Sequence, residues 1–260
     1  GSEIEILLCD KASPLRRRMA EIDPSDSSVR RHPLRLLHMS DLHISSDVYA
    51  DEAFRGFEAG LKLGMENGAD VTLIAGDLFD NGRIKQSLMD QVWDILGDVR
   101  MPVVVLPGNH DTVLTDGVRL GITPPDVTVM QEPEGEIVLL KEHGLSVWGK
   151  PVYDHHPGFR PMAGVPHRLD DHWYVGMAHG LYMDPPDPFR ASPISPDEIA
   201  MAPCDYVALG HVHVFRDVSQ NGVPAYYSGA PSGSQTKTVA IVDLDPVSGV
   251  SVSSLEIVLD

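Results

Sequence analysis

The sequence predicts an α/β fold in which two mixed β-sheets pack face to face between flanking helices, a four-layer α/β/β/α sandwich. The first half of the chain alternates short apolar strands with amphipathic helices, the pattern of a parallel sheet with covered faces. The second half carries many short strands with few helical stretches, which indicates a second sheet. The chain has 260 residues, of which 42% are hydrophobic. That is enough to bury a core of this size.

Residues 1–33 differ from the rest, and we predict an N-terminal extension to a domain that spans residues 34–260. The stretch "IEILL" at residues 4–8 is typical of a short strand. The segment after it is charged and rich in Ser and Pro, with basic clusters at Arg16–Arg18 and Arg30–Arg31. We interpret it as an appended arm whose arginines form a solvated face.

From Leu34 onward the predicted elements follow in a regular order. Apolar residues recur at helical spacing in two stretches, and the first begins with Asp51 and Glu52, which complement the helix dipole. The second stretch is expected to end at Gly97. The expected order is strand 34–39, helix 51–68, strand 71–75, helix 84–96 and strand 102–106.

The second half is predicted to be rich in strands, with one short helix and one long loop. Long loops in compact domains are often functional, so His155, His156, Arg160 and Arg168 in loop 150–172 are candidates to line a substrate groove. A solvated loop is the simpler interpretation. Strands are expected at 126–130, 135–140, 145–150, 173–178, 206–210, 213–219, 224–229, 238–245 and 250–259, with a helix at 195–202.

Composition limits the classes of function. The net charge is −18, with 38 acidic and 20 basic residues, which argues against broad attraction to nucleic acid or anionic lipid but permits a site made positive by divalent cations. Cys9 and Cys204 are the only cysteines, so a disulfide scaffold is excluded. No apolar run reaches the roughly 18 residues of a membrane-spanning helix. The acidic start "GSEIEILLCD" does not resemble a signal peptide, and we expect a cytoplasmic protein without a membrane partner.

The most informative feature is that five predicted strands each end at residues that can bind metal ions. Ligands in open α/β sheets lie beyond the carboxyl ends of the strands, so the positions add to what the residue types indicate. Residues i and i+2 of an extended segment point the same way and can face one ion. The residues at these ends are Asp41 and His43; Asp77 and Asp80; Asn109, His110 and Asp111; His179; and His211 and His213.

Each motif alone is weak, because turns and caps also explain short runs of this kind. Five such ends in one chain favour a shared site. One ion rarely takes seven protein ligands, whereas two ions that share a bridging carboxylate use them economically and can clamp a phosphoryl group. Mixed nitrogen and oxygen ligation suits Mn, Fe, Zn, Co or Ni, and we expect two divalent ions, with Mn first. The seven candidate ligands are Asp41, His43, Asp77, Asn109, His179, His211 and His213.

These motifs, "DLH", "GD", "GNHD", a lone "H" and "GHVH" in this order, resemble the calcineurin-like metallophosphoesterases over residues 34–232. The wording around them, such as "LLHMSDLHI" and "YVALGHVH", is most similar to the nuclease subunit of double-strand-break repair complexes. The resemblance implies that residues 34–260 are a catalytic domain. It implies Asp41, His43 and His213 at one metal, Asn109, His179 and His211 at the other, Asp77 as the bridge, and His110 beside the scissile phosphate without binding metal.

Two further residues keep two interpretations each. Asp111 is expected to cap a turn, although it could also orient the motif. Asp80 is either a surface turn residue or a residue that orients His43. Tyr182 is expected to pack within its loop rather than stack on a substrate.

The sequence and the resemblance together predict a phosphodiesterase that hydrolyses small or single-stranded phosphodiesters by attack of a hydroxide bridging the two ions. We expect a small phosphodiester or nucleotide as the partner, and the acidic charge disfavours nucleic acid. The alternatives are a DNA exonuclease or endonuclease subunit of a repair complex, and a noncatalytic metal-binding scaffold protein. A scaffold has no need of an uncoordinated His110, and phosphomonoesterase activity stays open.

Overall fold

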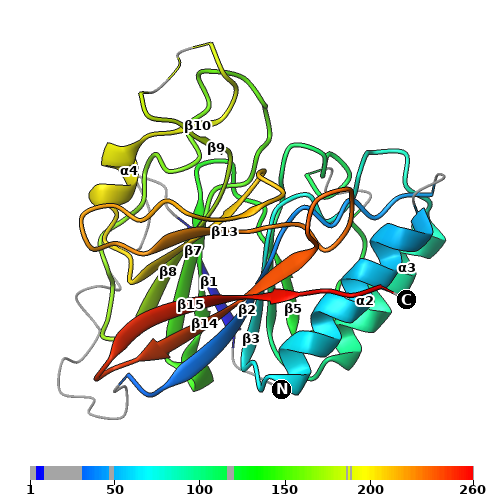
Figure 1. The fold of residues 1–260 in the computed structure, drawn as a ribbon, viewed down its shortest axis with the longest axis horizontal. Helices are drawn as coiled ribbons and strands as arrows, with labels where there is room; N and C mark the ends of the chain where they lie inside the picture. Colours follow the sequence, from blue (N-terminus) through cyan, green and yellow to red (C-terminus); the bar gives the residue numbers. More distant parts are fainter. Residues whose placement is uncertain are drawn as a thin grey trace.

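Two large mixed β-sheets pack face to face in the computed structural model, which confirms the predicted fold class (Figure 1). The structure describes residues 4–8, 31–46, 50–115, 120–185, 187 and 189–259. Arg16–Arg18 and Arg30 lie outside the described residues, so the solvated arm stays a prediction for them, as does the boundary at residue 34. Arg31 departs from it, because its guanidinium lies 4.7 Å from the centre of the Trp173 ring and 3.2 Å from the Asp205 carboxylate.

The six-stranded sheet is formed mainly by the first half of the chain. Its four strands from this half run parallel, and β14 and β15 join antiparallel beside β2. β3 and β4 are buried along their whole length, which explains their unbroken apolar sequences. The order is β15 (Gly249–Glu256), β14 (Thr238–Asp245), β2 (Leu34–Met39), β3 (Val71–Ala75), β4 (Val103–Leu106) and β5 (Val127–Val129).

The seven-stranded sheet has a parallel centre and antiparallel edges. The strand predicted at residues 4–8 forms and pairs with β6 of the same chain. The order is β1 (Ile4–Leu8), β6 (Glu136–Leu140), β7 (Leu145–Gly149), β8 (Trp173–His179), β11 (Tyr206–Gly210), β13 (Ala225–Ser228) and β12 (Phe215–Asp217). The short elements β9 (Leu181–Tyr182), β10 (Pro193–Ile194) and η1 (Lys141–His143) were not predicted, since two or three residues give no periodic signal.

Helices cover the two outer faces unequally. α2 (Ala50–Glu66) and α3 (Gln86–Asp98) lie along the six-stranded sheet, and α4 (Pro196–Ala200) lies on the opposite side of the molecule (Figure 1). Ser195 and Glu198 form a capping box that starts α4. Because α4 is short, loop residues such as Met162 complete the outer layer over the seven-stranded sheet.

Gly97 does not end α3, contrary to the prediction. The helix continues to Asp98, and the chain leaves it where Arg100 adopts a left-handed φ of 56°. A Cβ atom on Gly97 would lie 3.1 Å from the ring of Pro124. The glycine therefore provides space for a neighbouring segment rather than a helix stop.

The core between the sheets is built from alternate residues of the buried strands. Leu36, Leu73 and Val104 from one sheet pack against Val147 and Val175 from the other. This layer fixes how the carboxyl ends of the two sheets face one another.

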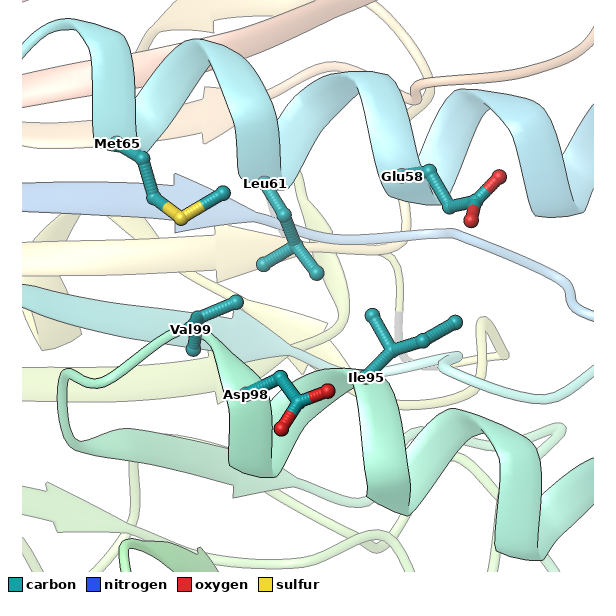
Figure 2. Close-up of a pocket in the computed structure, with 6 residues that line it drawn as sticks. All are labelled: Glu58, Leu61, Met65, Ile95, Asp98 and Val99. Atoms are coloured by element: carbon teal, nitrogen blue, oxygen red, sulfur yellow. The ribbon is translucent and has the colours of Figure 1, made fainter.

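A shallow groove of about 240 Å³ runs between α2 and α3 on the outer surface. Figure 2 shows its lining from both helices: Glu58, Leu61, Met65, Ile95, Asp98 and Val99. None of the predicted site residues contributes to it, so we assign the site from the placement of its polar atoms rather than from surface concavity. None of the described helices is both long and apolar enough to cross a membrane.

Three glycines spaced four residues apart allow α2 to lie close to the sheet. A Cβ on Gly56 would come within 2.3 Å of the Pro231 carbonyl oxygen, and one on Gly60 within 2.6 Å of the Met39 methyl group. A main-chain carbonyl cannot move aside as a methionine terminus can. The two positions therefore differ in their tolerance of a methyl group, although both are buried in the same helix.

We expect Gly56→Ala to lower the free energy of unfolding by about 1–3 kcal/mol through overpacking, against the usual gain from replacing a helical glycine. Gly60→Ala should cost less, and Glu58→Ala, on the exposed face of α2, should change stability by less than about 0.5 kcal/mol. Urea unfolding of the three variants measures this. Equal stability of Gly56→Ala and wild type would refute the close contact.

Candidate metal centre

The carboxyl ends of β2, β3, β4, β8 and β11 bring the seven candidate ligands to one edge of the sandwich. His179, at the end of β8, crosses to the other sheet, where its Nδ1–H donates to the Ala75 carbonyl at 2.9 Å. The main-chain N–H of His211 donates to the Asp41 carboxylate at 3.0 and 3.1 Å. Side chains more than one hundred residues apart therefore meet at a seam between the sheets.

The first group of donors consists of Asp41, His43 and His213. The Nε2 atoms of His43 and His213 are 3.3 Å apart, and the His213 Nε2 is 3.4 Å from a carboxylate oxygen of Asp41. Two ligands bound at about 2.1 Å to one ion lie roughly 3.0–3.4 Å from each other, depending on geometry. These three side chains could therefore hold one metal ion.

The second group consists of Asp77, Asn109, His179 and His211. The Asn109 side-chain oxygen lies 3.1 Å from the His179 Nε2 and 3.2 Å from the His211 Nδ1. The His179 Nε2 is also 3.2 Å from a carboxylate oxygen of Asp77. Asp77, His179 and His211 could hold a second ion, with the amide oxygen of Asn109 within the same range of distances.

The chemistry of the donor atoms fits a bound cation. Because the Nδ1–H of His179 is committed to the Ala75 carbonyl, a neutral His179 ring would present an Nε2 lone pair to the Asp77 carboxylate and the Asn109 oxygen. Three electron-rich atoms this close repel one another unless a positive charge lies among them. A proton on His179 or a metal ion satisfies this requirement.

Asp77 lies between the two groups. The carboxylate oxygen that faces His179 is also 3.9 Å from the His43 Nε2, which belongs to the first group. The other carboxylate oxygen accepts a hydrogen bond from the His110 main-chain N–H at 2.9 Å. One carboxylate is thus oriented toward both groups and fixed by the neighbouring loop.

Burial and the charges of the site together raise the pKa of His179 and lower the pKa values of Asp77 and His211. Burial opposes the charge of His179, but the Asp77 carboxylate raises the pKa of His179 to about 9. Burial alone would raise the pKa of Asp77. The positive charge and hydrogen bond of His179 outweigh this effect, so the pKa of Asp77 is held below its usual value. Burial and the charge of His179 lower the pKa of His211 to about 4. Neutral His211 suits metal coordination.

His110 is accessible beside these groups. Its side chain is 43% exposed, against 3% for Asp77. The Nδ1–H of His110 donates to the main-chain carbonyl of Asp80 at 2.7 Å, and the Asp80 carboxylate is 3.3 Å from the His43 Nδ1. These contacts favour the orienting interpretation of Asp80 over that of a surface turn.

Asp111 ties two of the site loops together. Its fully buried carboxylate accepts hydrogen bonds from the main-chain N–H groups of Gly108 at 2.9 Å, Leu78 at 3.2 Å and Phe79 at 2.7 Å. The expected turn cap is present at Gly108, and the bonds to Leu78 and Phe79 extend it to the loop of Asp77. Burial and the negative charge of Asp77 raise the pKa of Asp111 to about 7.

Backbone strain is concentrated at the site. Asp41, His43, Asp77 and His211 have φ values of 55°, 49°, 55° and 99°, a region that residues other than glycine rarely adopt. Such conformations cost on the order of 1–3 kcal/mol each and persist where the surroundings enforce them. Four of the seven converging residues are thus held in strained conformations.

Glycines precede three of the motif residues, Asp77, Asn109 and His211, and crowding explains why. A Cβ on Gly76 would lie 2.0 Å from the His179 ring, and one on Gly108 would lie 2.3 Å from an Asp77 carboxylate oxygen. Glycine is required there so that the backbone can approach the donor of another loop.

Of the four loop residues that the sequence offered as candidates to line a substrate groove, one lies at the site and three lie elsewhere. Only His155 contacts the cluster, with its ring centroid 5.6 Å from that of His211. His156 bonds within its own loop, Arg160 lies 3.9 Å from Glu198, and Arg168 pairs with Asp205 at 2.8 Å. Tyr182 packs within the fold, where its hydroxyl accepts from Gln220 at 3.0 Å.

Comparison with known proteins places these motifs in context. The calcineurin-like phosphoesterase family matches residues 34–215 of the chain. The "DNA double-strand break repair protein Mre11" of Aeropyrum pernix is 33% identical over 86 residues, which cover 30% of this chain and 21% of that protein. The "Uncharacterized metallophosphoesterase YhaO" of Bacillus subtilis is 24% identical over 217 residues, 75% of this chain and 52% of that protein.

A third relative, a "Probable cyclic nucleotide phosphodiesterase" of Moraxella catarrhalis, is 26% identical over 92 residues, 35% of this chain and 32% of that protein. The matches thus span from 21% to 52% of the lengths of these relatives. The crystal structure of TT1561 from Thermus thermophilus shares the fold, with a TM-score of 0.55 and 14% identity over 85% of this chain and 98% of that one.

We expect Asp111→Ala to lower the free energy of unfolding by about 3–5 kcal/mol, because it leaves three buried N–H groups without an acceptor. Asp111→Asn keeps one acceptor oxygen and should lie between this variant and wild type. Asp94→Ala, at an exposed carboxylate of α3, is the control. Denaturant unfolding measures the series, and equal effects of the two alanine variants would refute the role of Asp111.

Proposed function

The chain belongs to the calcineurin-like phosphoesterase family, and from this premise we propose that it is a dinuclear-metal phosphodiesterase acting on small or single-stranded phosphodiesters. The observation that carries the proposal is the convergence of overlapping donor groups around Asp77, with the side chain of His110 43% exposed beside them. His110 also lies within reach of an ion near His43 and Asp77, so its assignment as an acid–base group rather than a ligand rests on the family resemblance. Two adjacent cation sites and one accessible acid–base group are the requirements for in-line displacement at phosphorus.

In this proposal Asp41, His43 and His213 hold one divalent ion, Asn109, His179 and His211 hold the other, and Asp77 serves both. The placement of Asp77 between the groups supports its bridging role. The bound ions would supply an activated hydroxide near neutral pH and neutralise the phosphoryl oxygens. Mn²⁺ is the expected ion, since the mixed nitrogen and oxygen donors suit it.

His110 is proposed to assist the leaving group. Because its Nδ1–H is bonded to the Asp80 carbonyl, the ring is fixed, and in the protonated imidazolium form its Nε2–H is the group that can pass a proton to the leaving oxygen, which leaves a neutral ring. The carboxylate of Asp80 also contacts His43. Asp80 therefore links His110 to the first donor group and restricts their relative movement. We expect His110→Ala to lower kcat by a factor of about 10²–10⁴.

A diester substrate of modest size is supported by two observations. The net charge of −18 opposes extended contact with a polyanion. One of the relatives is described as a probable cyclic nucleotide phosphodiesterase. A DNA nuclease is the second candidate, favoured by the 33% identity to the repair protein Mre11. The position of exposed His110 argues against a noncatalytic scaffold.

Metal analysis separates the roles of Asp77 and His110. Wild-type protein dialysed from Mn²⁺ should retain about two ions per chain, as a dinuclear site requires. We expect Asp77→Ala to lose most of this manganese and all turnover, and His110→Ala to keep the metal while losing rate. Elemental analysis and circular dichroism measure content and folding. Unchanged manganese in folded Asp77→Ala would refute the bridging assignment.

An activity panel with added Mn²⁺ tests the substrate class. We expect bis(p-nitrophenyl) phosphate to be hydrolysed with a kcat/KM about tenfold or more above that of p-nitrophenyl phosphate. Cyclic nucleotides and single-stranded and double-stranded DNA complete the panel, with Asp77→Ala as the control for contaminating activity. Preference for the monoester would contradict the proposal, and faster cleavage of DNA than of the small diesters would favour the nuclease.

A further inference from the structure

A second histidine outside the seven candidate ligands, His155, lies beside the site. Its ring is 5.6 Å from that of His211 and tilted by 50° to it, whereas the ring of His110 is 4.8 Å from that of His43. The two histidines thus flank different donor groups. The family resemblance assigns no role to His155, and the sequence offers it only as one of four loop residues that could line a substrate groove.

The loop that carries His155 is anchored to the segment that carries His179. The His155 Nδ1 lies 2.9 Å from the Ser192 hydroxyl, and the Ser192 main-chain N–H donates to the His156 carbonyl at 3.2 Å. The Ser192 carbonyl in turn accepts from the main-chain N–H of Leu181 at 2.9 Å. Leu181 is two residues beyond His179, the last residue of β8. Ser192 is fully buried and has a left-handed φ of 47°.

Close packing fixes this anchor. A Cβ on Gly180, the residue after His179, would lie 2.2 Å from the Ser192 carbonyl oxygen. Only a glycine allows Ser192 to approach so closely. A strained residue and a required glycine therefore hold the His155 ring against His211, in a loop that otherwise has no helix or strand.

The hydrogen bonding leaves one nitrogen of His155 available. If the Ser192 hydroxyl donates to Nδ1, the ring hydrogen resides on Nε2. Among the described residues Nε2 has no hydrogen-bond partner, and the residue is exposed. His155 is also absent from the donor groups that could hold a metal ion. An oriented, exposed N–H donor beside a cation site is suited to bind an anionic oxygen.

We propose that His155 is a substrate-binding residue whose Nε2–H donates to a phosphoryl oxygen of the substrate held beside Asn109, His179 and His211. This inference rests on the proposed phosphoesterase function and adds a residue that binds the phosphoryl group. Ser192 is the residue that positions the imidazole. The substrate class is a phosphoester whose phosphoryl oxygens are contacted by both His110 and His155.

The neighbouring His156 provides a matched control. It is an exposed histidine of the same loop, but its Nδ1 accepts from Gly158 at 2.9 Å, and its Nε2 lies 3.4 Å from Asp154. Removal of this ring deletes an exposed imidazole from the same loop without removing a donor next to His211.

The experiment measures inorganic phosphate binding to the Mn²⁺-loaded protein by calorimetry, together with manganese content and the KM and kcat for bis(p-nitrophenyl) phosphate. We expect His155→Ala to weaken phosphate binding and to raise KM by about tenfold while two ions are retained, as for the loss of one hydrogen bond to an anion. His155→Gln should restore part of the affinity. Ser192→Ala should weaken binding by a smaller factor, and His156→Ala by less than about twofold.

Unchanged phosphate affinity in His155→Ala would overturn the inference, and so would loss of manganese from this variant, since the residue would then support the metal site instead. If wild-type protein binds phosphate but hydrolyses no ester of the panel, the proposed function fails while the phosphate affinities of the variants still decide the role of His155.

Discussion

The close approach of β3 and β11 at the edge of the sandwich is the constraint on which the site depends. The Ala75 carbonyl accepts from His179, and a Cβ on Gly210 would lie 1.8 Å from this same carbonyl oxygen. No other residue than glycine fits there without separating the sheets. The contact aligns the carboxyl ends of two sheets that are far apart in the sequence, and the donor atoms meet because of it.

The energy of this arrangement is unfavourable locally and is supported by the surrounding core. Four motif residues have left-handed φ values, and the buried carboxylates of Asp41, Asp77 and Asp111 lie close together. Hydrogen bonds from main-chain N–H groups to Asp41 and Asp111 offset part of the cost of burial. The two apolar layers on either side of the six-stranded sheet supply the rest.

The electrostatic pattern matches a site that gains stability by binding cations. Carboxylate oxygens and imidazole nitrogens face one another at 3.2–3.4 Å, distances that suit a shared proton or a shared metal ion. Such preorganisation allows binding with little rearrangement of the protein. In the proposed function, His110 and His155 are the exposed groups beside the donors that would contact an anionic phosphoryl group.

The sequence alone determined the fold class and the seven convergent residues, because strand ends and their motifs are local features read directly from the chain. The end of α3 was predicted wrongly, since Gly97 serves the packing of Pro124, a nonlocal contact. Tertiary structure alone decided that His155, rather than His156, Arg160 or Arg168, faces the site. The reason is physical: the direction of a loop side chain is set by contacts such as that with Ser192, thirty-seven residues away.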